Sequence, residues 1–165
     1  MVLDPRSLAL AAGIGLGATL TIDLWALGLR RAFGIASLSF CLLGRWILHM
    51  PAGRFVHASI GTAAPRPGEC AVGWTAHYLI GGSFGVLFTL VAPAGWLAGP
   101  TAGPALLFGV VTTLVPFLVL QPALGLGLAS SKAPRPWAAR LRSLATHTVF
   151  GAGLWLWALL LRRAA

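Results

Sequence analysis

The sequence predicts an all-α membrane protein, a four-helix transmembrane bundle of two hairpins with a short interfacial helix in the first cytoplasmic loop. Composition is the first observation behind this prediction. Hydrophobic residues make up 58% of the 165 residues and charged residues only 9%, whereas about 25% charged residues is usual in a soluble domain. The second observation is that the apolar residues form four stretches of about 20 residues, long enough to cross a bilayer as helices.

Each long apolar stretch is bounded by charged or turn-forming residues. Because backbone polar groups find no water inside a bilayer, each stretch is expected to be helical. The four expected helices cover residues of about 8–29, 69–92, 104–128 and 141–161. Arg30 and Arg31 close the first helix, and Pro116 and Pro122 lie inside the third. We interpret residues 1–165 as a single integral membrane domain.

A shorter apolar run lies between the first two long helices. The part between Arg31 and Arg45 is too short, as a helix, to cross a hydrocarbon core of about 30 Å. We therefore expect an interfacial helix over residues of about 38–49, ended by Pro51. A loop rich in proline and glycine follows it.

The basic residues orient the predicted bundle. Nine of the 12 Lys and Arg residues fall in two loops, as Arg30, Arg31, Arg45, Arg54, Arg66, Lys132, Arg135, Arg140 and Arg142, and the others are Arg6, Arg162 and Arg163 near the termini. Because cytoplasmic loops carry the excess of basic residues, loops one and three are expected inside and both termini outside. A basic protein can also bind nucleic acid, but no such motif is present, and the expected partner is the lipid bilayer.

Four polar residues interrupt the apolar stretches: Asp23, His77, Gln121 and His147. Counted at about 1.5 Å per residue from the nearest boundary, all four fall at a similar depth in the cytoplasmic half of the bundle. Tyr78 and several threonines lie close by in sequence as hydrogen-bond partners. Ionisable groups in hydrocarbon are costly and rarely occur there without a partner or a task. This layer is therefore the candidate site.

The sequence leaves several interpretations of the layer open. It could be purely structural, with Asp23 pairing with His147, His77 or Arg142 to fix the helix register. It could form a transport or proton-relay path, because Asp and His titrate readily and prolines can expose carbonyls. Asp23, His77 and His147 could instead bind a metal, or the two histidines a haem. No motif requires a cofactor, and a small transport or proton-relay protein is the leading hypothesis.

Residues near the layer predict an entrance rather than a catalytic centre. The candidates for a cytoplasmic mouth are Arg45, His49, His57, Glu69 and Arg142. Ordinary interfacial solvation accounts for the same residues, and an acid such as Glu69 is also favoured in the first turn of a helix. No hydrolase, kinase or nucleotide-binding motif is present, so nothing in the sequence indicates an enzyme.

Small residues predict close helix contacts. Gly13 and Gly17 form a small-xxx-small pair on the first long helix, and Gly81 and Gly85 form another on the second. One stripe of the second long helix repeats at every fourth residue, as Glu69, Gly73, His77, Gly81 and Gly85. Such a stripe is typical of a close crossing with another helix.

The two cysteines, Cys41 and Cys70, form no CxxC motif. Both fall on the side that is expected to be cytoplasmic, where thiols stay reduced. Cys70 lies at a helix start, which could activate its thiol. No structural disulfide is expected.

Several short motifs, taken together, resemble a known family. They are Gly17-Ala-Thr-Leu-Thr-Ile-Asp23-Leu-Trp25, Gly44-Arg-Trp-Ile-Leu-His49-Met50, Gly68-Glu69, Gly73-Trp74, His77-Tyr78, Pro116-Phe117, Gln121-Pro122, Gly125-Leu-Gly127 and Arg140-Leu-Arg-Ser-Leu144 before His147. The chain resembles small bacterial inner-membrane proteins that are known only as a domain of unknown function. The resemblance implies four membrane helices and a bacterial inner (plasma) membrane, and it implies no activity.

Four helices make a narrow bundle. A conducting path would therefore be expected to need a homo-oligomer or a larger membrane complex. An accessory structural subunit of such a complex is the remaining alternative for this chain.

Overall fold

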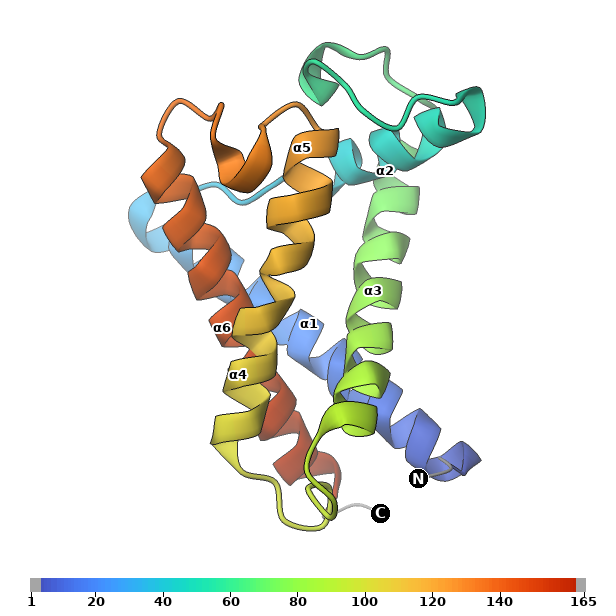
Figure 1. Cartoon of the computed structure of the whole chain (residues 1–165), viewed down its shortest axis with the longest axis vertical. Coiled ribbons are helices and arrows are strands. Elements are labelled where there is room, and N and C mark those ends of the chain that lie inside the picture. The colour runs from blue at the N-terminus through green and yellow to red at the C-terminus, as the bar shows by residue number, and fades with distance from the viewer. Residues whose placement is uncertain (1–3, 163–165) are drawn as a thin grey trace. The chain divides into compact units, whose positions relative to one another are not determined.

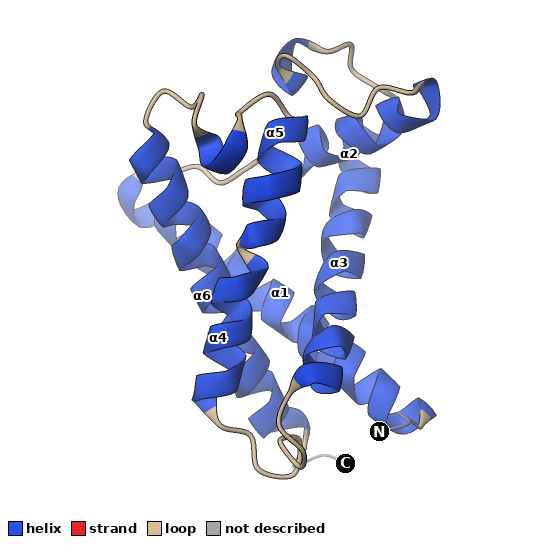
Figure 2. Cartoon of the chain, in the orientation of Figure 1, coloured by secondary structure: helices blue, strands red, loops and turns tan. Residues whose placement is uncertain are grey.

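The computed structural model describes residues 4–162, and every regular element in that range is helical (Figures 1 and 2). Three long helices are continuous: α1 (Pro5–Phe33), α3 (Glu69–Val91) and α6 (Pro136–Leu161). The short helix α2 (Phe40–His49) lies between α1 and α3 along the chain. The all-α prediction and the short helix in the first loop are thus confirmed. Arg163, counted above among the terminal charges, lies outside the described residues.

The third apolar stretch is divided rather than continuous. It contains α4 (Ala102–Thr112), the π-helical turn η3 (Pro116–Leu120) and the single turn α5 (Gln121–Ala123). Proline lacks an N–H and its ring clashes with the preceding turn, so Pro116 cannot continue an α-helix, and the backbone widens into the π turn. The helical part ends at Ala123 rather than near Leu128, because Gly125 and Gly127 have positive φ angles of 92° and 72°.

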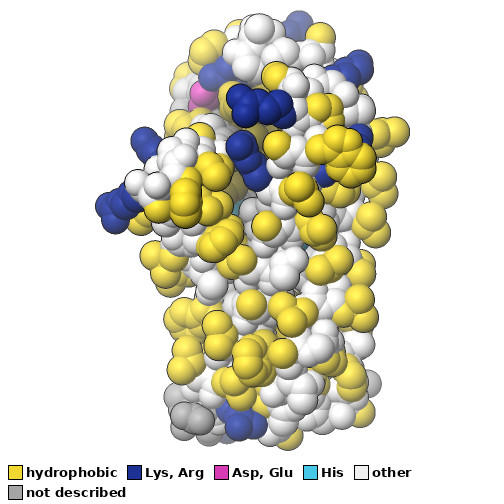
Figure 3. All heavy atoms as spheres, turned by 90° about the vertical axis from the view of Figure 1, so that its left-hand side faces the viewer, with side chains coloured by type: hydrophobic (Ala, Val, Ile, Leu, Met, Phe, Trp, Pro, Cys, Tyr) yellow, Lys and Arg dark blue, Asp and Glu magenta, His cyan; other side chains and the backbone are white. Residues whose placement is uncertain are grey.

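Four segments are long and apolar enough to cross a membrane: Pro5–Phe33, Glu69–Val91, Ala102–Ala123 and Pro136–Leu161. Large apolar side chains such as Leu24, Leu107 and Leu118 remain exposed on them. On the face drawn in Figure 3, hydrophobic side chains are spread widely, whereas Lys and Arg form only a few groups. The chain therefore has the make-up of a multi-pass membrane protein.

The residues group into two compact units, which we describe separately. The first unit consists of the described parts of Met1–Ala36, Tyr78–Val111 and Ala145–Ala165, and the second of Ser37–His77 and Thr112–Leu144. The first unit holds α1, α4 up to Val111 and the later turns of α3 and α6. The second holds α2, the loop after it, η3, α5 and the first turns of α3 and α6.

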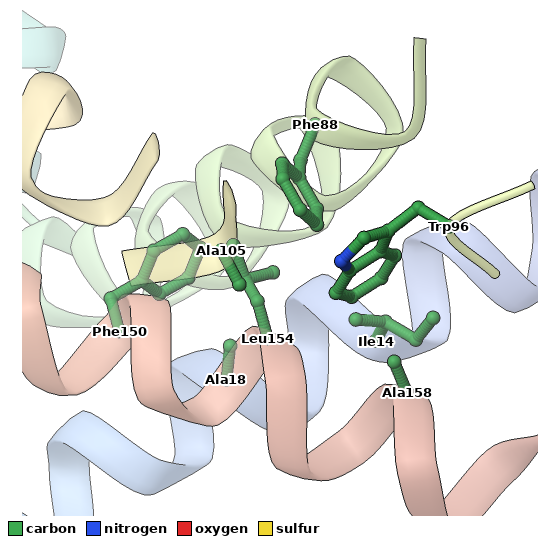
Figure 4. Close-up of a cluster of buried hydrophobic side chains, with 8 residues drawn as sticks. All are labelled: Ile14, Ala18, Phe88, Trp96, Ala105, Phe150, Leu154 and Ala158. Atoms are coloured by element: carbon green, nitrogen blue, oxygen red, sulfur yellow. The ribbon is translucent and has the colours of Figure 1, made fainter. Parts of the chain in front are cut away.

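The core of the first unit joins four helices and one loop. Its buried members are Ile14, Ala18, Phe88, Trp96, Ala105, Phe150, Leu154 and Ala158 (Figure 4). Phe88 meets the Trp96 ring edge-on, with the ring centroids 4.6 Å apart. The indole N–H of Trp96 donates a hydrogen bond of 3.0 Å to the carbonyl of Thr101, which orders the loop after α3. Because lipid is as apolar as these side chains, close packing rather than burial from water distinguishes this core.

Glycines let α1 and α3 touch through their backbones in the first unit. A Cβ on Gly85 of α3 would lie 2.6 Å from the backbone nitrogen of Gly15 on α1. The close pair Gly81 and Gly85 therefore acts as expected, but its partner is Gly15 instead of Gly13 and Gly17. A Cβ on Gly13 would have Leu161 at 3.6 Å, an ordinary contact, whereas Gly17 lies against the Trp157 ring.

A similar contact joins α2 to α3 in the second unit. A Cβ on Gly44 would meet the backbone of Glu69 and, at 2.6 Å, the nitrogen of Gly73. The loop after α2 then pairs with the end of the third apolar stretch. The backbone nitrogen of His57 donates to the carbonyl of Ala123 at 2.9 Å, and that of Ile60 to Leu124 at 3.1 Å.

We expect Gly85→Ala to destabilise the protein, because the added methyl group meets backbone that cannot move aside. The expected loss is about 1–3 kcal/mol of the free energy of unfolding, the usual cost of overpacking. Thermal unfolding in detergent, followed by Trp fluorescence, measures it. Gly82→Ala is the matched control, since its nearest neighbour would be the Leu16 side chain at 3.5 Å. Equal stability of the two variants would contradict the backbone contact between α1 and α3.

Candidate functional site

Asp23 and Tyr78 join α1 to α3 inside the first unit. The Tyr78 hydroxyl donates a hydrogen bond of 2.8 Å to Oδ2 of Asp23. Both side chains are half-buried. A hydrogen bond to a carboxylate is stronger than one between neutral groups, so it offsets part of the cost of placing an acid in an apolar region. Tyr78 thus acts as one of the nearby hydrogen-bond partners that the sequence indicated.

The pair lies well inside two of the candidate membrane spans. At 1.5 Å per residue, Asp23 falls about 15 Å before the end of α1, and Tyr78 about 14 Å after the start of α3. Both residues are therefore far along the helix axis from either end of their spans. An acid and a hydroxyl group at that position are the strongest candidate for intramembrane chemistry in the first unit.

His147 belongs to the same unit and is half-buried on α6. Helix α4 crosses α6 closely at this turn. A Cβ on Gly109 would lie 2.5 Å from the carbonyl oxygen of His147 and 2.7 Å from the backbone of Gly151. The small residue at position 109, which the sequence analysis did not single out, permits this approach.

His77 lies in the second unit, where it contacts aromatic side chains. Its ring stacks on Phe40 of α2, with centroids 3.9 Å apart and an interplanar angle of 24°. Trp74, one turn earlier on α3, presents its ring edge-on to His77 at 5.9 Å. The imidazole is therefore held against α2 on one of its faces.

Gln121 also lies in the second unit and is only 8% exposed. Its Nε2 donates a hydrogen bond of 3.1 Å to the Ser143 hydroxyl, which ties α5 to the first turns of α6. Its Oε1 is buried and accepts no hydrogen bond from the described part of the chain. Gln121 thus fixes a helix contact while keeping one unpaired acceptor.

The four predicted layer residues therefore divide between the two units. Asp23 and His147 lie in the first, and His77 and Gln121 in the second. Contacts within each unit pair Asp23 with Tyr78, pair Gln121 with Ser143 and stack His77 on Phe40. A single layer made of all four residues stays a prediction.

Among the predicted mouth residues, Arg45 and Glu69 form a two-pronged ion pair. Arg45 Nε lies 2.8 Å from Glu69 Oε2, and Nη2 lies 2.7 Å from Oε1. The third guanidinium nitrogen donates to the carbonyl of Ala63 at 3.1 Å, and Glu69 accepts the backbone N–H of Arg66 at 2.9 Å. Hydrogen bonding to Glu69 raises the pKa of Arg45 above its ordinary value. The pair anchors the loop between α2 and α3.

His49 and His57 meet beside this ion pair in the second unit. His49 is 1% exposed, and its Nε2 lies 3.0 Å from the carbonyl oxygen of Ala64. The two imidazole rings are edge-to-face, with centroids 5.2 Å apart. Arg142 lies instead on the exposed surface of α6, where it lines an open hollow of about 330 Å³ together with Arg135. The predicted mouth residues thus have different surroundings: Arg45 and Glu69 form a half-buried ion pair near the buried His49, whereas Arg142 is exposed on α6.

The expectation of no structural disulfide was wrong. Cys41 and Cys70 form a disulfide bond, with Cα atoms 3.9 Å apart. The physical reason is the glycine contact described above, since Gly44 and Gly73 each lie three residues after a cysteine and let α2 and α3 approach closely. The sequence separation of 29 between the two cysteines contains no information on that distance.

Metal ligation was one of the open interpretations. Within residues 4–162, no group of three or more His, Cys, Asp and Glu side chains is arranged to hold a metal ion. The metal interpretation thus has no support from the described residues.

A family model described as "Protein of unknown function (DUF2938)" matches residues 12–161, which is most of the chain. The chain belongs to the DUF2938 family. The resemblance to a family of unknown function is thereby confirmed. No curated protein and no solved structure matches the chain. Membership of the DUF2938 family assigns no activity, so a functional proposal has to start from the contacts themselves.

The contacts in this DUF2938 member include three features that the sequence analysis missed. Ser143 as the partner of Gln121 is one, and the aromatic face that Phe40 presents to His77 is another. The Cys41–Cys70 bond is the third. For the disulfide a signal existed, since each cysteine is followed three residues later by a glycine that permits close helix approach.

We expect Arg45→Gln to lower the midpoint of thermal unfolding by several degrees and to expose the loop after α2 to limited proteolysis. The reason is that Glu69 and several loop carbonyls lose their common donor. Arg54→Gln is the matched control, because it removes the same charge from an exposed position of that loop. If Arg45→Gln behaved like Arg54→Gln in both measurements, the ion pair would not be the loop anchor.

Proposed function

We propose that this DUF2938 protein is a small multi-pass membrane protein that moves protons across the bilayer, with Asp23 as the group that binds and releases them. The observation that carries this proposal is the Asp23–Tyr78 hydrogen bond of 2.8 Å inside two candidate spans. Ionisable residues within membrane segments are costly and commonly mark ion or proton pathways.

The chemistry of the two side chains suits a relay. A carboxyl group exists in protonated and ionised forms, and a phenolic hydroxyl both donates and accepts hydrogen bonds. Tyr78 can therefore stabilise the ionised acid by donating to it and can turn its hydroxyl elsewhere when Asp23 is protonated.

In this proposal the other polar residues are supporting members of the path. His147 in the first unit is the other ionisable residue of the predicted layer there. His77 and Gln121 are the polar residues of the predicted layer that lie in the second unit. The π turn at Pro116–Leu120 directly precedes Gln121, and π turns occur frequently at functional sites.

The proposal includes the location and orientation of the protein. We place it in the inner membrane of a bacterium, with loops one and three in the cytoplasm and both termini outside. The support for this orientation is that nine of the 12 Lys and Arg residues lie in those two loops. Because four helices enclose little space, a homo-oligomer or a larger membrane complex would complete the conducting path.

We expect proteoliposomes that contain the wild-type chain to pass protons down a pH gradient, measured with an entrapped pH-sensitive dye and valinomycin to compensate charge. Asp23→Asn should reduce the flux to that of empty vesicles, because the amide cannot exchange a proton. Tyr78→Phe should lower it by about tenfold, the rate equivalent of about 1.4 kcal/mol of lost hydrogen bonding to a charged group.

Asp4→Asn is the matched control for this experiment. Asp4 caps α1 outside the span by accepting the backbone N–H groups of Arg6 and Ser7, and asparagine caps helices equally well. Its flux should equal that of the wild type. A flux in Asp23→Asn no lower than in Asp4→Asn would refute the relay. If Asp23→Asn then only lowered thermal stability, the pair would be a helix contact in an accessory membrane subunit.

A further inference from the structure

The Cys41–Cys70 disulfide lies where two helices begin. Cys41 is the second residue of α2 and Cys70 the second residue of α3. Helix N-termini favour the thiolate form of cysteine, which is the form that attacks disulfides and leaves from them. Cys70 is exposed and Cys41 is half-buried. Cys70 is therefore the more exposed residue of the bond, and the sulfur of Cys41 is suited to be the leaving group.

Three other contacts hold α2 against α3 in the second unit. The backbones meet at Gly44 and Gly73, Arg45 binds Glu69 with two hydrogen bonds, and Phe40 stacks on His77. Each of these lies within one or two turns of the disulfide. Reduction of the bond would therefore leave the two cysteines close together, ready to form it again.

The disulfide belongs to the part of the chain that is rich in basic residues, where a disulfide is unusual for the proposed orientation. Both cysteines border the first loop, which carries Arg45, Arg54 and Arg66 and which the proposed orientation places in the cytoplasm. Structural disulfides are rare in that reducing compartment, and those that do occur there are usually transient, catalytic or redox-sensing. A disulfide on the basic side of a membrane protein is thus more readily understood as a reactive bond than as a permanent crosslink.

We propose that Cys41 and Cys70 form a reversible thiol–disulfide site that exchanges electrons with a cytoplasmic dithiol. The proposal rests on the orientation given under the proposed function, but it does not require proton movement.

The exchange proceeds in two displacement steps. A thiolate of the dithiol attacks Sγ of Cys70, the bond between the two cysteines breaks, and its electron pair leaves on Sγ of Cys41. The second thiol of the reductant then attacks the reductant's own sulfur in this mixed disulfide, which closes the reductant's disulfide and releases Cys70. Two electrons and two protons pass from the dithiol to the cysteine pair. An oxidised dithiol reverses both steps.

The test uses the full chain in sealed membrane vesicles of both orientations, with dithiothreitol as the reductant and a membrane-impermeant maleimide as the label. Inverted vesicles, which expose the cytoplasmic face, should gain no label before reduction and should label Cys70 in most molecules after it. In a parallel sample, an excess of oxidised dithiothreitol added after the reduction and before the label should keep Cys70 unlabelled. Right-side-out vesicles should stay unlabelled throughout.

Cys41→Ser is the matched control, because it leaves Cys70 as a free thiol without any reductant. It should label at once in inverted vesicles and not in right-side-out vesicles. Labelling of Cys70 only from the outside would overturn the proposal, since the bond would then be a crosslink in an oxidising compartment. Reduction that succeeds only after denaturation would overturn it as well. Neither result bears on the proton flux through Asp23, so the two proposals fail separately.

Discussion

Close contact between helix backbones at glycine is the constraint on which the rest of this structure depends. Inside a bilayer, apolar side chains gain little by leaving lipid for protein, so helices associate through packing at small residues and through polar contacts. The chain uses this device at three crossings: Gly15 with Gly85, Gly109 with Gly151, and Gly44 with Gly73. The α1–α3 crossing accompanies the Asp23–Tyr78 hydrogen bond, and the α2–α3 crossing accompanies the Arg45–Glu69 ion pair and the disulfide. At these two crossings the candidate functional contacts thus depend on the helix packing.

The Arg45–Glu69 ion pair and the Asp23–Tyr78 hydrogen bond differ in whether the acid has an oppositely charged partner. Arg45 and Glu69 each carry a full charge, and their paired hydrogen bonds at 2.7 and 2.8 Å neutralise both. Such a pair is suited to holding a loop on a helix end. Tyr78 gives Asp23 a hydrogen bond and carries no charge that would pair with an ionised acid. The first arrangement is suited to an anchor, whereas the second joins α1 to α3 through one hydrogen bond at an acidic side chain.

Much of the fold could be predicted from the sequence, because membrane helices follow from uninterrupted apolar stretches of sufficient length. The short helix α2 was predictable for the same reason, since its apolar run is too short to cross. The candidate site was predictable only in part. A polar residue within an apolar stretch is evident from the sequence, as Asp23 and Gln121 are. Its partner depends on how two helices cross, and the sequence does not indicate that Ser143 is the partner of Gln121. A proline within an apolar stretch indicates an interruption of the α-helix, as at Pro116. The end of the helical part at Ala123 could not be predicted, because it depends on the backbone angles of Gly125 and Gly127.

Helix α3 shows how one sequence pattern can serve two different contacts. Its stripe at every fourth residue begins with Glu69 and Gly73, which meet Arg45 and Gly44 of α2 in the second unit. The same stripe continues with Gly81 and Gly85, which meet α1 in the first unit. The periodicity alone predicts close contact and does not distinguish one partner helix from two. Composition within the stripe does distinguish them, because the charged and aromatic-stacked members face α2, and the pure glycine pair faces α1. The residue that follows His77 at this change of partner is Tyr78, the donor to Asp23. The donor to Asp23 therefore lies at the point along α3 where the neighbouring helix changes from α2 to α1.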